Sequence, residues 1–176
     1  MFSFSRTKMK KDLRIAVAVI AVFALAFAGL IFVIRMEPRI LDKSETAGEP
    51  ENRSAIVGYE SYEVPDVCKV KICCEPLLEN GYASIYLTSP SDNNVLIRAE
   101  LYSVKIAYDE STGQATFLPD KLLGKTGFIH PGSYVEKVKV KGLKAGEETK
   151  VLVKISTMYE ASGTSNGSFY IRTNIK

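Results

Sequence analysis

The pattern of hydrophobic and polar positions changes at about residue 67. Before that point one long apolar run dominates, and after it apolar and polar residues alternate with a period of two. In residues 68–74 (CKVKICC), the even positions are apolar and the odd positions are mostly charged. The same alternation returns in stretches 82–88, 95–102, 137–141, 150–156 and 169–175. A period of two predicts half-buried β-strands rather than helices.

Turn-forming residues separate these stretches. They are the segments Glu79-Asn80-Gly81, 89–93 (SPSDN), 109–113 (DESTG), His130-Pro131-Gly132, Ala145-Gly146 and Ser162-Gly163-Thr164. Short strands at this spacing predict an antiparallel sandwich or barrel. For residues 67–176 we expect an all-β fold, an immunoglobulin-like antiparallel β-sandwich of about seven strands. The chain has no tryptophan, and its cysteine spacing differs from that of true immunoglobulin domains.

The long apolar run extends from Ile15 to Ile34 and contains no charged residue. As a helix it would be about 30 Å long, which matches the hydrocarbon thickness of a bilayer. We therefore predict a single transmembrane helix at 15–34, which makes the lipid bilayer the first expected partner. The alternative is a cleaved signal peptide, because Ala26-Phe27-Ala28 has the small-x-small form. The run is longer than the apolar core of an ordinary signal peptide.

Charge along the chain indicates the orientation of this helix. Residues 1–35 carry a net charge of +5, residues 36–66 carry −5, and residues 67–176 carry +3. Because basic residues stay on the cytoplasmic side, we predict a cytoplasmic tail at 1–14 and an extracellular C-terminal domain, in a single-pass protein of the cell membrane. A charge of +3 is too small to indicate a nucleic-acid partner.

Residues 35–66 show no strand or helix period. They are acidic and contain Pro38, Pro50 and Pro65. Such a composition predicts a stalk or linker between the membrane and the domain. Alternatively, the last third of this segment docks on the domain through its apolar residues Ile56, Val57, Tyr59 and Tyr62.

The segment 126–155 (TGFIHPGSYVEKVKVKGLKAGEETKVLVKI) resembles small β-sandwich ectodomains of membrane-anchored proteins from Gram-positive bacteria. The matching residues are Gly127, Ile129, Pro131, Gly132, Glu136, Leu143 and Gly146, with Pro90 and Asn93 upstream. The resemblance implies an Ig-like module of the cell envelope, without implying a known chemistry. It rests on residues that form turns and covers about half of the domain.

Few residues have a pattern that is typical of catalysis. The only histidine, His130, lies in a predicted turn, and no Ser, Cys or Asp accompanies it in a known motif. Gly124-Lys125-Thr126 resembles the end of a phosphate loop, but Pro119 stands where that loop needs glycine. We therefore expect no catalytic residue, no metal ligand and no cofactor, and a protein that is not an enzyme.

The three cysteines lie close together in one predicted strand. Cys68 and Cys74 would be about 20 Å apart along it, and a disulfide tolerates about 7 Å between Cα atoms. We expect buried thiols at Cys68 and Cys74 and an exposed thiol at Cys73. The alternatives are an intermolecular disulfide through Cys73 and a metal or redox role.

Tyrosines and arginines fall on the solvent side of the predicted strands. The candidate interaction face consists of Tyr82, Tyr86, Arg98, Tyr102, Tyr170 and Arg172. Tyr and Arg are favoured at contact hot spots, although tyrosine also simply suits a half-buried strand. Together these features predict a non-catalytic, membrane-anchored envelope protein. Its partners would be other envelope proteins or a surface glycan, in a larger membrane assembly.

The alternative is an envelope enzyme or a substrate-binding accessory domain. Its site would combine His130 with the loop acids Asp109, Glu110 and Asp120. A β-sandwich is compatible with either function, because such folds host many activities.

Overall fold

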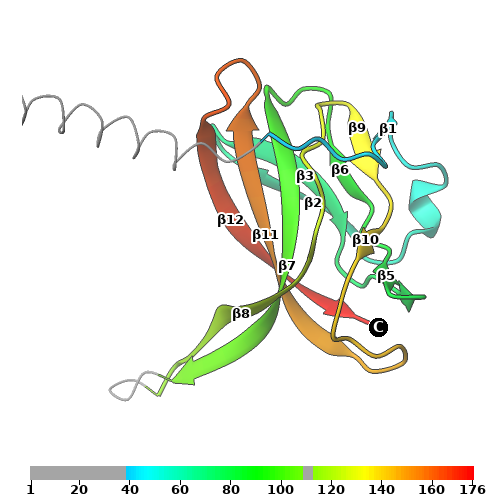
Figure 1. Ribbon diagram of the computed structural model, residues 1–176, viewed down its shortest axis with the longest axis vertical. Coiled ribbons are helices and arrows are strands. Elements are labelled where there is room, and N and C mark those ends of the chain that lie inside the picture. The colour runs from blue at the N-terminus through cyan, green and yellow to red at the C-terminus, as the bar shows by residue number, and fades with distance from the viewer. Residues whose placement is uncertain (1–38, 109–112) are drawn as a thin grey trace, which may run out of the picture. The chain divides into compact units, whose positions relative to one another are not determined.

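The computed structural model describes residues 39–108 and 113–176 (Figure 1). The predicted cytoplasmic tail at 1–14 and the predicted transmembrane helix at 15–34 lie outside these ranges. Within them, no helix is both long enough and apolar enough to cross a membrane.

The described part of the chain is built from β-strands, with a single short 3-10 turn. In chain order the elements are β1 (Thr46–Ala47), η1 (Arg53–Ala55), β2 (Tyr59–Val64), β3 (Cys68–Cys73), β4 (Leu78–Glu79), β5 (Tyr82–Ala83), β6 (Leu87–Ser89), β7 (Val95–Tyr108), β8 (Ala115–Lys125), β9 (Ser133–Val135), β10 (Val138–Lys139), β11 (Thr149–Tyr159) and β12 (Ser165–Ile175). The all-β prediction is confirmed.

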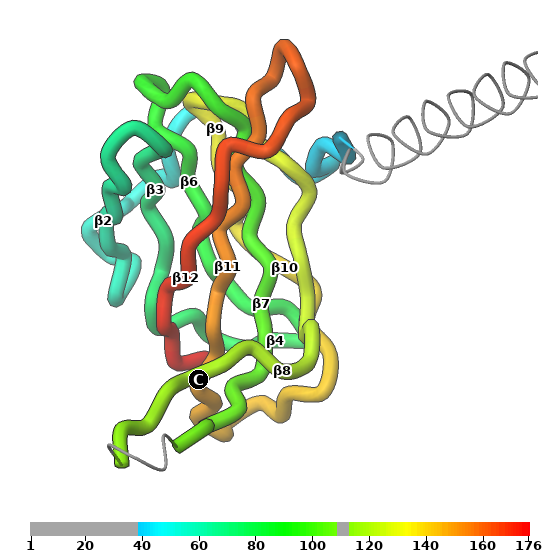
Figure 2. The backbone as a smooth tube through the Cα atoms, turned by 90° about the vertical axis from the view of Figure 1, so that its left-hand side faces the viewer, coloured from blue at the N-terminus to red at the C-terminus, as the bar shows by residue number. Residues whose placement is uncertain are grey.

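The strands form three antiparallel sheets. Their orders are β1-β9-β6-β3-β2, β12-β11-β7-β8 and the small β10-β5-β4. The two larger sheets occupy separate layers of the domain (Figure 2). Side chains from both of them contribute to one hydrophobic core. Val70 and Ile72 of β3 belong to it together with Ile97 and Leu101 of β7 and Ile155 of β11. The alternation seen in the sequence therefore marks the side chains that fill this core.

The segment predicted to be a stalk, 35–66, is part of the domain wherever the structure describes it, from residue 39 onward. Strand β2 pairs with β3 along its whole length, from Tyr59↔Cys73 to Val64↔Cys68. Upstream, the main chain of Phe128 donates to Ile40 O at 2.8 Å and accepts from Asp42 N at 2.9 Å. The alternative prediction, that the last third of segment 35–66 docks on the domain, is thus correct for β2. An edge strand can be polar, because main-chain hydrogen bonds hold it whatever its composition.

Strands β7 and β8 form a long hairpin whose far end projects from the domain (Figure 1). The side chains of β7 are buried from Val95 to Leu101 and become exposed from Lys105 onward. The projecting end, residues 104–108 and 115–122, is called the arm below. Its exposed apolar residues include Ile106 (47%), Tyr108 (69%) and Leu122 (49%).

Candidate functional site

The six residues of the predicted interaction face lie on two separate parts of the domain. Arg98, Tyr102, Tyr170 and Arg172 share the solvent side of the sheet β12-β11-β7-β8, since Leu152 on β11 pairs with both Tyr102 and Arg172. Tyr82 and Tyr86 do not belong to this sheet. The prediction of one continuous face is therefore corrected.

The strand that the sequence predicts over 82–88 is interrupted between Tyr82 and Tyr86, and its two parts join two different sheets. The sequence predicted one strand over 82–88, but the structure has β5 and β6 with a gap at 84–86. Tyr86 has a φ of 45°, in the left-handed region that a tyrosine rarely adopts. Its main-chain N–H donates to Glu136 O at 3.0 Å. This conformation interrupts the alternation on which the predicted face depended.

The solvent side of β12-β11-β7-β8, with the adjoining side of the arm, is called the outer face. Cross-strand pairing places five basic residues and one acidic residue on it: Arg98, Lys125, Lys150, Lys154, Arg172 and Glu100. Tyr170 is 49% exposed, and the Arg172 guanidinium lies 5.5 Å from the ring centroid of Phe117 on the arm. A cavity of about 270 Å³ lies between Phe117, Val104 and Arg172. The outer face is therefore basic, with exposed aromatic side chains.

Arg98 has a packing role on this face. It is only 9% exposed, and its guanidinium lies 4.6 Å from the ring centroid of Phe128. Phe128 belongs to a small buried cluster with Leu96 and Met158. The guanidinium also pairs with Glu100 at 3.2 Å. The prediction that Arg98 is available for contact with a partner is corrected, because its side chain covers this small buried cluster.

Tyr102 lies beside the same carboxylate. Its hydroxyl donates to Glu100 at 3.3 Å. Burial, and then the negative charge of Glu100, raise the pKa of the Tyr102 hydroxyl. At neutral pH this tyrosine is thus a neutral donor.

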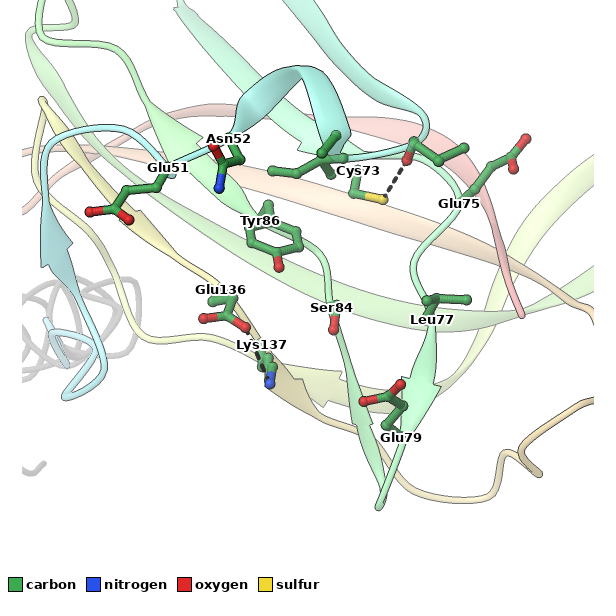
Figure 3. A pocket seen from close by; sticks show the side chains of 13 residues that line it. Glu51, Asn52, Cys73, Glu75, Leu77, Glu79, Ser84, Tyr86, Glu136 and Lys137 are labelled. Atoms are coloured by element: carbon green, nitrogen blue, oxygen red, sulfur yellow. Dashed lines mark hydrogen bonds and ion pairs between the residues drawn. The ribbon is translucent and has the colours of Figure 1, made fainter.

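Tyr86 lines a pocket of about 460 Å³ on another part of the domain (Figure 3). Four carboxylates surround the pocket, namely those of Glu51, Glu75, Glu79 and Glu136. The apolar lining includes Ile56, Val57 and Leu77, of which Val57 is 71% and Leu77 is 56% exposed. Burial, and then Glu136, raise the pKa of the Tyr86 hydroxyl. This set of residues is called the acidic pocket.

Two ammonium groups lie beside these carboxylates. Lys137 pairs with Glu136 at 3.2 Å, and Lys176 pairs with Glu75 at 2.5 Å. Within residues 39–108 and 113–176, Glu51 and Glu79 form no ion pair, and both side chains line the pocket (Figure 3). The pocket keeps a surplus of negative charge. Tyr82 lines a shallower neighbouring cavity with Tyr134.

Cys73 is buried, contrary to the prediction of an exposed thiol. Only 4% of the residue is accessible, and its Sγ donates to Val57 O at 3.2 Å. The chain before β2 covers it, and the main chain of Cys74 donates to Gly58 O at 2.7 Å. All three cysteines are free thiols. An intermolecular disulfide through Cys73 would require this covering segment to open.

Burial raises the pKa of each thiol, to about 11 for Cys68. A raised thiol pKa lowers the thiolate fraction and hence the reactivity toward metals and oxidants. Among the described residues, no group of three or more His, Cys, Asp or Glu side chains is arranged to hold a metal ion. Cys68 and Cys73 therefore act here as small core residues, whereas Cys74, predicted to be buried, is only partly buried and packs against the core.

His130 anchors the N-terminal segment. Its main-chain N–H donates to Glu45 Oε1 at 2.7 Å, and its Nδ1 lies 3.0 Å from the same oxygen. Its Nε2 lies 3.6 Å from Glu160, which in turn pairs with Arg39 at 2.7 Å. No sequence pattern indicated Glu45 or Glu160 as partners of His130, because they lie 85 and 30 positions away along the chain.

The structure does not bring His130 and Asp120 together. Asp120 accepts from Ser103 Oγ at 3.4 Å, while the neighbour of His130, Ile129, pairs with Ile97. Ile97 and Ser103 are six residues apart on β7, which corresponds to about 20 Å. Asp109 and Glu110 lie outside the described residues. The acid set suggested for an enzyme is thus not assembled around His130 within the described chain.

Comparison with protein families, curated proteins and solved structures found no match to the chain.

Proposed function

We propose that this chain is a non-catalytic, membrane-anchored protein of a bacterial cell envelope. In this proposal residues 15–34 cross the membrane, the N-terminus is cytoplasmic, and an Ig-like β-domain outside the cell binds another envelope protein. The apolar run and the basic residues before it support the topology. The antiparallel all-β architecture is compatible with the Ig-like class.

The observation that carries the binding function is the composition of the outer face. Tyr170 and Arg172 are solvent-exposed residues of the two types that dominate contact hot spots. Beside them, the arm exposes Ile106, Tyr108 and Leu122. Large exposed apolar side chains that gather in one place mark an interaction surface. We infer that the outer face and the arm together form that surface.

A protein partner is favoured over a glycan by the aliphatic residues. A sugar stacks on aromatic rings and hydrogen-bonds with charged groups, and Tyr170 and Arg172 suit both kinds of partner. Ile106 and Leu122 offer neither a ring nor a polar atom, and covering them stabilises only a complex with an apolar counterpart.

Site-specific crosslinking tests the binding function. A photoreactive amino acid at Tyr170, in the full chain in cells, should crosslink to a defined protein. The double variant Tyr102→Ala, Arg172→Ala should capture less of the same product. Position Lys144, an exposed site on the β10–β11 loop (side chain 79% accessible), is the matched control. Equal capture from positions 144 and 170 would refute the proposed surface.

Protease treatment tests the topology. Protease added to intact cells should remove the C-terminal domain and leave a tag at residue 1 intact. A protected domain with an accessible N-terminal tag would contradict the proposed orientation.

A further inference from the structure

Two surfaces of the domain carry opposite charge, and each includes exposed apolar side chains. The outer face has five basic residues and one acid, a surplus of four positive charges. The acidic pocket has four carboxylates against the ammonium groups of Lys137 and Lys176, a surplus of two negative charges. Complementary potentials of this kind steer association and fix its orientation.

The apolar parts of the two surfaces also correspond. On the outer face, Tyr170 and Leu122 are each 49% exposed. At the acidic pocket, Val57 and Leu77 are 71% and 56% exposed. Burial of these four side chains against one another would remove large exposed apolar groups of both surfaces from water, which favours association.

The shapes are compatible as well. The outer face presents side chains that stand out from a sheet, with Tyr170 and Arg172 at neighbouring outward positions of β12. The acidic pocket is a hollow of about 460 Å³ with Tyr86 and Ser84 inside it (Figure 3). A protruding tyrosine or arginine fits such a hollow, and a guanidinium over the Tyr86 ring adds a cation–π contact.

We propose that the acidic pocket of one copy of this chain receives the outer face of a second copy. The inference rests on the proposed function of the outer face, and it names the partner: another molecule of the same protein, bound head to tail. Glu79 and Glu136 face Arg172 and Lys150 across this interface. Because the two surfaces differ, the contact is heterologous, and each copy keeps one surface free for the next.

Other occupants of the outer face fit less well. A two-fold dimer through this face would bring two surplus charges of +4 against each other, which is repulsive. An anionic membrane surface would accept the basic residues, but the sequence places Asp109 and Glu110 between the two strands of the arm, where they oppose insertion. Membrane anchoring would raise the local concentration of copies and strengthen a weak head-to-tail contact.

Crosslinking between differently tagged copies tests the proposal. Two tagged forms of the full chain are expressed together, one of them with a photoreactive amino acid at Tyr170. We expect a copy-to-copy product whose second peptide falls in segments 51–57, 75–79 or 136–137. The variant Arg172→Glu, Lys150→Glu in the photoreactive copy should lower the yield about tenfold, which corresponds to about 1.4 kcal/mol of association free energy.

Charge reversal on the other copy provides the decisive comparison. Glu79→Lys, Glu136→Lys in the copy without the photoreactive group should lower the yield in the same way. When this copy is combined with the Arg172→Glu, Lys150→Glu copy, the yield should recover, because the charges are complementary again. Lys144→Glu in the photoreactive copy, on the exposed β10–β11 loop outside both surfaces, is the matched control and should leave the yield unchanged.

Three results would overturn the proposal. They are the absence of a copy-to-copy product, a product that joins the outer faces of both copies, and a crosslinking yield that neither charge reversal changes. A product with lipid would instead identify the membrane as the occupant. If position 170 captures a different protein and no second copy, this inference fails and the proposed binding function stands. If it captures nothing, both fail.

Discussion

The side chain of Asn93 hydrogen-bonds to both main-chain groups of Lys69. Its Oδ1 accepts from Lys69 N at 2.8 Å, and its Nδ2 donates to Lys69 O at 2.7 Å. The same Nδ2 also donates to Ser89 Oγ at 2.9 Å. The Asn93 amide thus makes the main-chain hydrogen bonds that a neighbouring strand would otherwise make with Lys69. These bonds connect the start of β3 to the turn between β6 and β7. This connection explains why the segment 89–94 needs asparagine at this position.

Loss of the Asn93 amide should destabilise the domain. Asn93→Ala removes three hydrogen bonds and leaves the main chain of Lys69 without them, at a cost of about 1–3 kcal/mol. Urea unfolding followed by circular dichroism measures the change. Asn94→Ala, an exposed neighbour, is the control and should shift the free energy of unfolding by less than about 0.5 kcal/mol. Equal effects of the two substitutions would show that the amide contributes nothing specific.

The domain should require the segment 39–66. A fragment of residues 67–176 lacks β2, which covers the edge of β3, and the chain that pairs with Phe128. We expect the fragment 39–176 to unfold cooperatively in urea and the fragment 67–176 to show no cooperative transition. If 67–176 unfolds with the same midpoint and slope as 39–176, the N-terminal segment is not an integral part of the domain.

The Cys68 thiol should make stability depend on pH in the alkaline range. Burial raises its pKa from 9.0 to about 11, so the folded state favours the protonated thiol. This contribution is complete below pH 9 and is lost as the pH rises toward 11, because the unfolded chain ionises first. Two pKa units at about 1.4 kcal/mol each give an upper limit of about 3 kcal/mol.

Comparison with Cys68→Ala isolates this effect from the tyrosines and lysines that titrate in the same range. The difference in unfolding free energy between wild type and variant should shrink between pH 8 and pH 11. A constant difference would mean that the thiol stays protonated in both states or is accessible in the folded one.

Arg98 and Arg172 should behave differently although both lie on the outer face. Arg98→Ala removes the guanidinium that stacks on Phe128 and pairs with Glu100, which leaves Glu100 with only the more distant Lys154. This substitution should lower the free energy of unfolding by about 1–3 kcal/mol. Arg172→Ala, at an exposed position, should cost less than about 0.5 kcal/mol. Thermal or urea unfolding of the two variants decides the matter. A destabilising Arg172→Ala would make Arg172 part of the packing and weaken its role as a contact residue.

The sequence alone determined the elements whose signal is local. Successive side chains of a strand point to opposite sides, so alternation marked β3, β7, β11 and β12 and the residues that fill the core. Turn residues marked the ends of these strands. The arm strand β8 was missed, because most of its side chains are exposed and Pro119 interrupts it.

Only the tertiary structure decided which surfaces belong together. Parity along a strand says which way Tyr82, Tyr86 and Tyr102 point from their own backbone, but not which sheet they join. Tyr82 and Tyr86 are separate from the outer face because β5 and β6 join two other sheets. Cys73 is buried, and β2 is a strand, because residues far along the chain supply the cover and the main-chain hydrogen bonds. Such contacts leave no periodic trace in the sequence, since they depend on how the whole chain packs.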